Sequence, residues 1–273
     1  MDANRRSAAI RLVLANAAVS LSLLACLSSV SLPFVGTPGD AGNEEEGSLP
    51  TGADARSLLE QAITLYGAGD YAGATDLLDQ LIQDEPSNSE AYYYRGRSAY
   101  KLGDLEQAVA DLDSAISLAP QHAGAYYYRG RVQYRAGHYA EAVEDLGRAV
   151  SLDPENAQAF VYRGRALFKL GRYLEAVQDE TQAIALQPNA ADAYYYRGRA
   201  YYKLEQYFVT VADMDQVIAL EPDNANAYFY RARAYAKVNA ITRAVEDLQK
   251  ALSLTLPDNL RARAEALLAK IRP

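Results

Sequence analysis

The sequence repeats itself every 34 residues, and this period limits the possible folds more than any other feature. The stretch AYYYRGR occupies Ala91–Arg97 and returns at Ala125–Arg131 and Ala193–Arg199. Weaker copies stand at Ala159–Arg165 and Ala227–Arg233. A unit of this length is one small motif that buries its apolar face only by stacking against its neighbours. We therefore expect a linear stack of similar units and not a single central core.

Aligned on this period, the sequence divides into six units, which are residues 55–88, 89–122, 123–156, 157–190, 191–224 and 225–258. Five units end in a proline two residues before the boundary. Each unit is divided near its middle by a turn such as LGD at Leu102–Asp104. Glycine ends a helix at such a turn, and proline prevents the next helix from continuing. Each unit is therefore predicted to be two helices joined by a short turn.

This pattern resembles the tetratricopeptide repeat family over residues 55–258. In the second unit the positions that carry the resemblance hold Tyr92, Arg95, Gly96, Ala108, Ala115 and Pro120, with arginine in place of the usual leucine. The resemblance implies an all-α fold, a right-handed α-solenoid of six helix-turn-helix repeats. Three residues depart from the family pattern: Thr210 at a small position, Glu205 at a turn glycine, and Glu180 at a packed apolar position.

The last segment, residues 259–273, is predicted to add one more amphipathic helix. Its apolar stripe is formed by Leu260, Ala264, Leu267, Leu268 and Ile271. The last repeat has no following neighbour, so a helix with a polar outer face must cover it. We interpret this segment as a capping helix without a binding role.

The first 35 residues have the pattern of a signal peptide or membrane anchor. Three arginines precede an uncharged run from Leu12 to Val35. LLAC at Leu23–Cys26 resembles a lipoprotein signal, which makes Cys26 a candidate for lipidation, but the apolar run continues beyond it and fits an uncleaved anchor better. Basic residues stay on the cytoplasmic side. We therefore expect the repeats to lie outside the cytoplasm, with the membrane contacted through this segment only.

Residues 36–54, GTPGDAGNEEEGSLPTGAD, are rich in glycine, proline and acid. Such a composition buries too little apolar surface to offset the entropy of ordering. We expect a flexible acidic linker between the amino-terminal segment and the repeats.

Two columns of arginine recur in the stacked units. The first arginine column is Arg95, Arg129, Arg163, Arg197 and Arg231. An aspartate follows each of them after 16 residues, and the first unit lacks both members. This concordance predicts an ion pair between the two helices of each of the other five repeats, because an arginine close to packed surface needs a partner to offset its desolvation.

The second arginine column lies two residues further on and consists of Arg97, Arg131, Arg165, Arg199 and Arg233. Residues two apart on a helix point in nearly opposite directions, so this column serves another surface. Four residues later stands a column that we call the outer cations: Lys101, Arg135, Lys169, Lys203 and Lys237. Aromatic residues precede the arginines by four positions, among them Tyr93, Tyr127 and Tyr195. By resemblance to the family, this face lines a concave groove.

The sequence shows no pattern typical of catalysis. Its only histidines, His122 and His138, lie near turns without metal-ligand spacing, and no glycine-rich phosphate loop precedes a helix. No enzyme activity and no cofactor are expected. Two binding hypotheses remain open. The groove could hold an acidic peptide or protein segment in a scaffold for protein assembly, or an anionic envelope polymer or glycan. The net charge of −8 argues against nucleic acid as a partner.

Overall fold

The computed structural model describes residues 52–271. Within these residues the chain forms thirteen helices and no strand. Their bounds are α2 Gly52–Ala68, α3 Tyr71–Asp84, α4 Ser89–Leu102, α5 Leu105–Leu118, α6 Ala123–Ala136, α7 Tyr139–Leu152, α8 Ala157–Lys169, α9 Tyr173–Leu186, α10 Ala191–Lys203, α11 Tyr207–Leu220, α12 Ala225–Lys237, α13 Ile241–Ser253 and α14 Asp258–Ile271.

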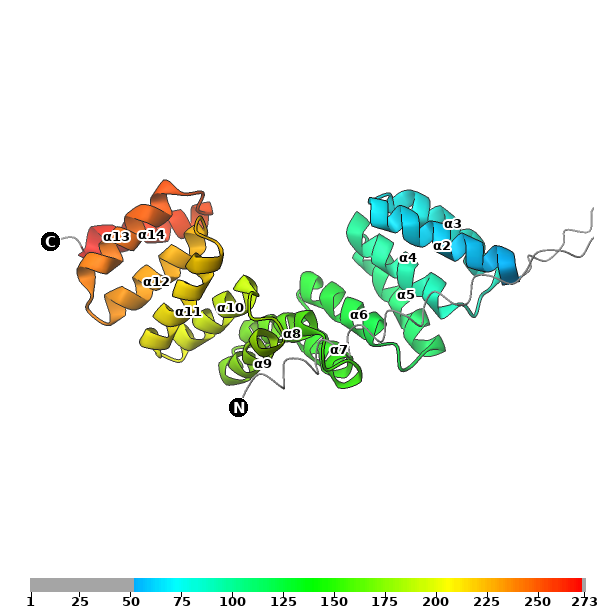
Figure 1. Cartoon of the computed structure of the whole chain (residues 1–273), viewed down its shortest axis with the longest axis horizontal. Coiled ribbons are helices and arrows are strands. Elements are labelled where there is room, and N and C mark those ends of the chain that lie inside the picture. The colour runs from blue at the N-terminus through cyan, green and yellow to red at the C-terminus, as the bar shows by residue number, and fades with distance from the viewer. Residues whose placement is uncertain (1–51, 272–273) are drawn as a thin grey trace, which may run out of the picture. The chain divides into compact units, whose positions relative to one another are not determined.

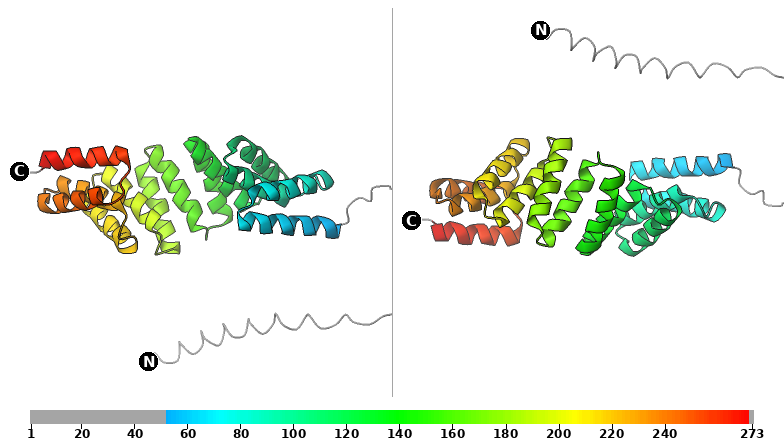
Figure 2. Two further views of the ribbon diagram at one scale, coloured as in Figure 1. Left: turned by 90° about the horizontal axis from the view of Figure 1, so that it is seen from above. Right: turned by 90° about the horizontal axis from the view of Figure 1, so that it is seen from below.

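The helices form antiparallel pairs that stack in chain order (Figure 1). We call the even-numbered members α2 to α12 the first helices and their odd-numbered partners the second helices. Each first helix packs on its own second helix and on the first helices of adjacent pairs, and α4 to α12 also pack on the second helix of the preceding pair. Helix α14 packs on α12 and α13 at the carboxyl end of the stack (Figure 2). The predicted all-α solenoid of six helix pairs and a capping helix is confirmed.

The turn between the two helices of each repeat contains one residue in the left-handed backbone conformation. In the first four repeats this residue is a glycine, at Gly69, Gly103, Gly137 and Gly171. In repeats five and six, Glu205 at φ 61° and Asn239 at φ 59° take its place. Glutamate accepts this conformation at an energetic cost, whereas asparagine tolerates it better. The missing glycine in repeat five therefore leaves the turn in place and strains it.

Small residues let the two helices of a repeat approach closely. A Cβ atom added to Gly96 of α4 would lie 3.0 Å from the Cγ atom of Leu112 on α5, and Gly130 is similarly packed on Leu146. Repeat six has Ala232 at this position, fully buried. The glycines of the YRGR stretches thus lie within helices and serve close packing of the two helices.

No helix within residues 52–271 is both long and apolar enough to cross a bilayer. The predicted anchor at residues 1–35, the lipidation candidate Cys26 and nearly all of the predicted linker at residues 36–54 lie outside the described residues. These expectations therefore stay predictions from the sequence.

Candidate functional site

The first arginine column forms the predicted ion pairs inside the repeats. In repeat two, Arg95 donates from Nε and Nη2 to both carboxylate oxygens of Asp111, at 3.0 and 2.6 Å. The same two-point pairing joins the other four arginines to Asp145, Asp179, Asp213 and Asp247. All five aspartates are buried, with at most 6 % of their surface exposed. The hydrogen bonds with Asp111 raise the pKa of Arg95. This column holds first and second helices together.

Sequence reasoning missed a second partner of these arginines. The free Nη1 atom of Arg95 donates to Asp79 on the preceding second helix, and Arg129 and Arg231 do the same to Asp113 and Asp215, each at 2.6 Å. Arg197 contacts Thr181 instead at 3.2 Å, and the corresponding position before Arg163 is Gly147. We call an arginine that binds an aspartate of its own repeat and one of the preceding repeat a complete clamp. Each complete clamp also ties one repeat to the one before it. The signal was present in the sequence, because these acids stand 16 residues before their arginines.

The second arginine column lies among aromatic rings. Arg97 of α4 lies within 5.1 Å of the centres of four rings, those of Tyr66 on α2, Tyr93 and Tyr94 on its own helix, and Tyr128 on α6. Arg131, Arg165, Arg199 and Arg233 are similarly stacked on rings of their own and adjacent first helices. These cation–π contacts join neighbouring repeats, a role that the sequence analysis did not foresee.

These stacked arginines are half-buried and nearly all lack a carboxylate partner. The Nε atoms of Arg97, Arg131, Arg165 and Arg199 are buried and have no hydrogen-bond partner within residues 52–271. Among the described residues, only Arg165 of this column pairs with an acid, Asp192 on α10, at 2.7 Å. Arg165 therefore differs from the rest of the column in having an acid partner. The other four arginines of this column contact aromatic rings, whereas the arginines of the first column contact aspartates.

The outer cations stand in the last turns of the first helices, and all five are exposed. Arg135 donates from Nη1 to the carbonyl oxygen of Tyr100 at 3.1 Å. The ammonium groups of Lys101 and Lys169 lie 5.9 Å from the ring centres of Tyr71 and Tyr139. Within the described residues, no outer cation forms an ion pair. Their charges remain available to a ligand.

Tyr93, Tyr127 and Tyr195 of this face are neutral hydrogen-bond donors at physiological pH. Burial raises the pKa of Tyr127 to about 12 and raises the pKa of Tyr93 and Tyr195 as well. Their rings meet those of neighbouring tyrosines edge-on, as between Tyr127 and Tyr162 at 6.0 Å. The predicted site residues Tyr93, Tyr127 and Tyr195 therefore lie with the arginines on one surface, but much of each ring is already covered.

The histidines have structural roles at or near helix ends. His122 accepts the backbone N–H of Ala125 at its Nδ1 atom, which caps α6, and its Nε2 atom lies 3.0 Å from Glu90. His138 lies 2.9 Å from Gln133. No group of three or more potential metal ligands occurs in residues 52–271.

Sequence and structure comparisons identify the same kind of repeat. A profile described as tetratricopeptide repeat matches residues 59–123, 95–149, 127–187 and 211–259. A second profile of the same description matches residues 192–224. No curated protein matches the chain at a significant level of sequence similarity.

Solved structures of three other proteins share the fold. A tetratricopeptide repeat protein from Parabacteroides merdae is 20 % identical with a TM-score of 0.65, over 80 % of this chain and 88 % of that one. YrrB, described as having an unusual peptide-binding site, is 24 % identical with a TM-score of 0.62, over 69 % and 97 %. MamA from Desulfovibrio magneticus is 22 % identical with a TM-score of 0.58, over 62 % and 96 %. At these identities the likeness establishes the fold alone.

Proposed function

Because the chain belongs to the tetratricopeptide repeat family, we propose that it is a non-catalytic scaffold that binds an acidic segment of a partner protein. The observation that carries this proposal is the contrast between the two arginine columns. On the same helices, every arginine of the first column binds a buried aspartate. In the second column, within residues 52–271, only Arg165 has an acid partner, and this partner, Asp192, is exposed. Such arginines can donate hydrogen bonds to carboxylates from outside the chain.

Electrostatics favour an acidic ligand on this face. The chain as a whole carries a net charge of −8, yet the first helices place ten cations in two adjacent columns. A local positive surface on an acidic protein steers acidic partners toward it and repels them elsewhere. Neutral tyrosine hydroxyl groups beside the cations add hydrogen bonds and contact area. YrrB shares the fold and is described as binding peptide, which agrees with this ligand class.

The alternative ligand, an anionic glycan or envelope polymer, would need open aromatic faces on which its rings could stack. Here guanidinium groups and neighbouring tyrosines already cover these faces, as around Arg97 and Arg131. Carboxylates of a peptide need only the charged edges of the arginines and the exposed outer cations. This favours the peptide.

The outer cations give the cleanest test, since the stacked arginines also support the fold. We expect Lys169→Glu with Lys203→Glu to weaken binding of a fluorescent peptide of alternating glutamate and serine at least about tenfold, a loss of about 1.4 kcal/mol. The control, Arg148→Glu with Lys250→Glu, makes the same charge change on exposed positions of second helices. Equal affinity of the two variants, measured by anisotropy at low salt, would refute the proposal.

We also propose that the repeats are displayed outside the cytoplasm, tethered through residues 1–35. The support is the basic head and the uncharged run from Leu12 to Val35. Protease added to intact cells should then digest the repeats, and the protein should sediment with membranes. Loss of membrane association on Cys26→Ser alone would identify a lipoprotein instead of an anchor. Recovery of the full chain from the soluble cytoplasm would contradict both forms of the proposal.

A further inference from the structure

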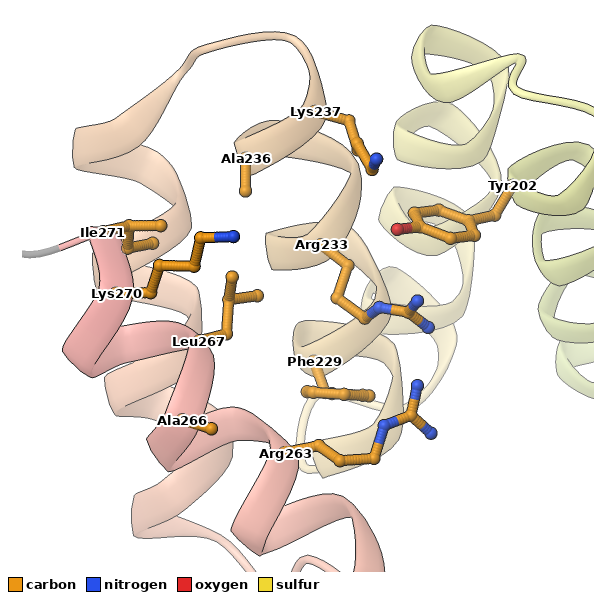
Figure 3. A pocket seen from close by; sticks show the side chains of 10 residues that line it. All are labelled: Tyr202, Phe229, Arg233, Ala236, Lys237, Arg263, Ala266, Leu267, Lys270 and Ile271. Atoms are coloured by element: carbon orange, nitrogen blue, oxygen red, sulfur yellow. The ribbon is translucent and has the colours of Figure 1, made fainter.

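A pocket of about 480 Å³ opens between α12, the first helix of repeat six, and the capping helix α14 (Figure 3). Its size falls within the range of about 300–1,000 Å³ typical of ligand pockets. Ten residues line it: Tyr202 of α10, Phe229, Arg233, Ala236 and Lys237 of α12, and Arg263, Ala266, Leu267, Lys270 and Ile271 of α14. We call it the terminal pocket.

Apolar side chains form much of the lining of the terminal pocket. Phe229 is almost completely buried, whereas Leu267 and Ile271 of the capping helix remain half-buried. Ala236 and Ala266 keep the space between α12 and α14 open because they have no bulk to fill it. This lining would gain from contact with a large apolar side chain.

Four of the ten lining residues are cations, and none of the ten is acidic (Figure 3). Arg233 and Lys237 come from α12, and Arg263 and Lys270 from α14. The guanidinium carbons of Arg233 and Arg263 lie 5.7 and 5.6 Å from the centre of the Phe229 ring. None of the four cations forms an ion pair within residues 52–271.

A helix that only covers the last repeat has no need for this arrangement. Leu260, Ala264 and Leu268 already bury one face of α14 against the stack. Arg261 donates weakly to the carbonyl oxygens of Leu252 and Leu254, near the end of α13. Arg263 and Lys270 instead line the pocket, so α14 adds two cations to the two that α12 supplies.

We propose that the terminal pocket binds one large apolar side chain of an acidic peptide segment, with the four cations pairing with carboxylates on either side of that residue. For the acidic character of the ligand, this inference rests on the proposed function. It goes further by giving the ligand an apolar anchor and by making the capping helix part of the binding surface. A small inorganic anion would leave the apolar lining uncovered, which is why we favour a peptide.

The test compares three blocked peptides by fluorescence anisotropy with the full-length chain. One contains Asp-Asp-Leu-Asp-Asp, the second replaces leucine with serine, and the third replaces the four aspartates with asparagine. We expect the first to bind at least about tenfold tighter than the second, since a tenfold gain needs only about 1.4 kcal/mol and burying leucine supplies that much. We expect the third to bind at least about tenfold more weakly than the first.

Two variants should weaken binding of the leucine peptide by different routes. Arg263→Ser with Lys270→Ser removes the cations of α14, and Ala266→Phe fills the pocket from an exposed position without changing charge. We expect both to bind the leucine peptide about as weakly as the serine peptide, at unchanged melting temperature. The matched control, Arg148→Ser with Lys250→Ser, should keep the tenfold preference. A preference for leucine that survives both pocket variants would overturn the proposal.

The outcomes separate this inference from the proposed function. If neither acidic peptide binds the unaltered chain, the proposed function fails and this inference fails with it. If both acidic peptides bind equally and Lys169→Glu with Lys203→Glu weakens both, only the terminal pocket is wrong. The last measurement is binding to vesicles that contain phosphatidylglycerol. Binding to these vesicles that is lost in Arg263→Ser with Lys270→Ser, without any preference for the leucine peptide, would show a lipid site and overturn the proposed peptide site.

Discussion

Repeats two and four are both antiparallel helix pairs, but they differ in the residue at the centre of the core. In repeat two, α4 packs on Leu112, which is fully buried in a continuous apolar cluster. In repeat four the same position holds Glu180, also fully buried, and the buried apolar residues fall into two separate clusters. Both carboxylate oxygens of Glu180 are buried, and neither has a hydrogen-bond partner in the described part of the chain. A repeat can therefore keep its backbone geometry while its core loses much of its stability.

The links to neighbouring repeats differ in the same direction. Arg95 of repeat two holds Asp111 in its own repeat and Asp79 in the one before. Among the described residues, Arg163 of repeat four binds only Asp179, because Gly147 stands where the preceding acid would be. On the other side, Thr181 offers Arg197 a neutral hydroxyl group. Repeat four thus combines a weak core with incomplete clamps on both sides, and in a stack stabilised by nearest-neighbour contacts it should open first.

The largest expected effect comes from exchanging the two core residues. Leu112→Glu should destabilise the array by about 3–5 kcal/mol, because it buries a carboxyl group in a continuous apolar cluster. Glu180→Leu should stabilise it by about 1–3 kcal/mol, by removing a buried polar group without a partner. Denaturant unfolding followed by circular dichroism measures both. If Glu180→Leu lowers stability, Glu180 has a favourable role and the comparison with repeat two is wrong.

The second effect is a dependence on pH that arises from Glu180 of repeat four. Burial raises the pKa of Glu180 well above its ordinary value of 4.5, and the charge of Arg165 offsets this only in part. Asp179 on α9 raises it further, as does Asp192 on α10, while Arg197 on α10 lowers it. The folded state therefore holds this proton more tightly than the unfolded state. The stability that the protonated group contributes is complete below pH about 4.5 and is lost as the pH rises through the folded pKa.

Comparison with Glu180→Gln isolates this term, since glutamine has nearly the same shape and does not titrate. Above pH about 4.5, the stability of the unaltered chain should fall relative to that of the variant by up to about 1.4 kcal/mol per pH unit, until the folded pKa is passed. Chemical denaturation at a series of pH values gives the difference directly. A constant difference across the series would show that Glu180 has the same pKa in both states.

The sequence predicted the repeats and the ion pair inside repeats two to six, because both recur at fixed intervals. It identified Glu180 as a departure but could not show that no group pairs with it, which depends on the packing of α8, α9 and α10. The stacking of the second arginine column also escaped prediction. Whether Arg97 points to solvent or lies on Tyr66 depends on how neighbouring first helices cross, and spacing within one helix does not determine that. The terminal pocket depends in the same way on where α14 docks.

The third effect compares the two acids of a complete clamp, on which the first arginine column depends. Asp145 is buried and bonded to Arg129 at two points, whereas Asp113 bonds to it once and its side chain is 53 % exposed. Asp145→Ala should cost about 1–3 kcal/mol, and adding Arg129→Met should recover much of that loss. Asp113→Ala should cost at most about 1 kcal/mol. Equal losses from the two single variants would mean that burial does not set the strength of the clamp.

The smallest effect would bring repeat four closer to repeat two by restoring the missing acid. A Cβ atom added to Gly147 would meet only the Nη1 atom of Arg163, at 3.8 Å, so an aspartate has room there. Gly147→Asp should stabilise the array by about 0.5–1 kcal/mol, from an exposed ion pair and from replacing a glycine within a helix. The control Gly147→Asn has a similar shape without the charge. The gain of aspartate over asparagine should shrink as salt is raised, and a gain that does not respond to salt would show that no clamp has formed.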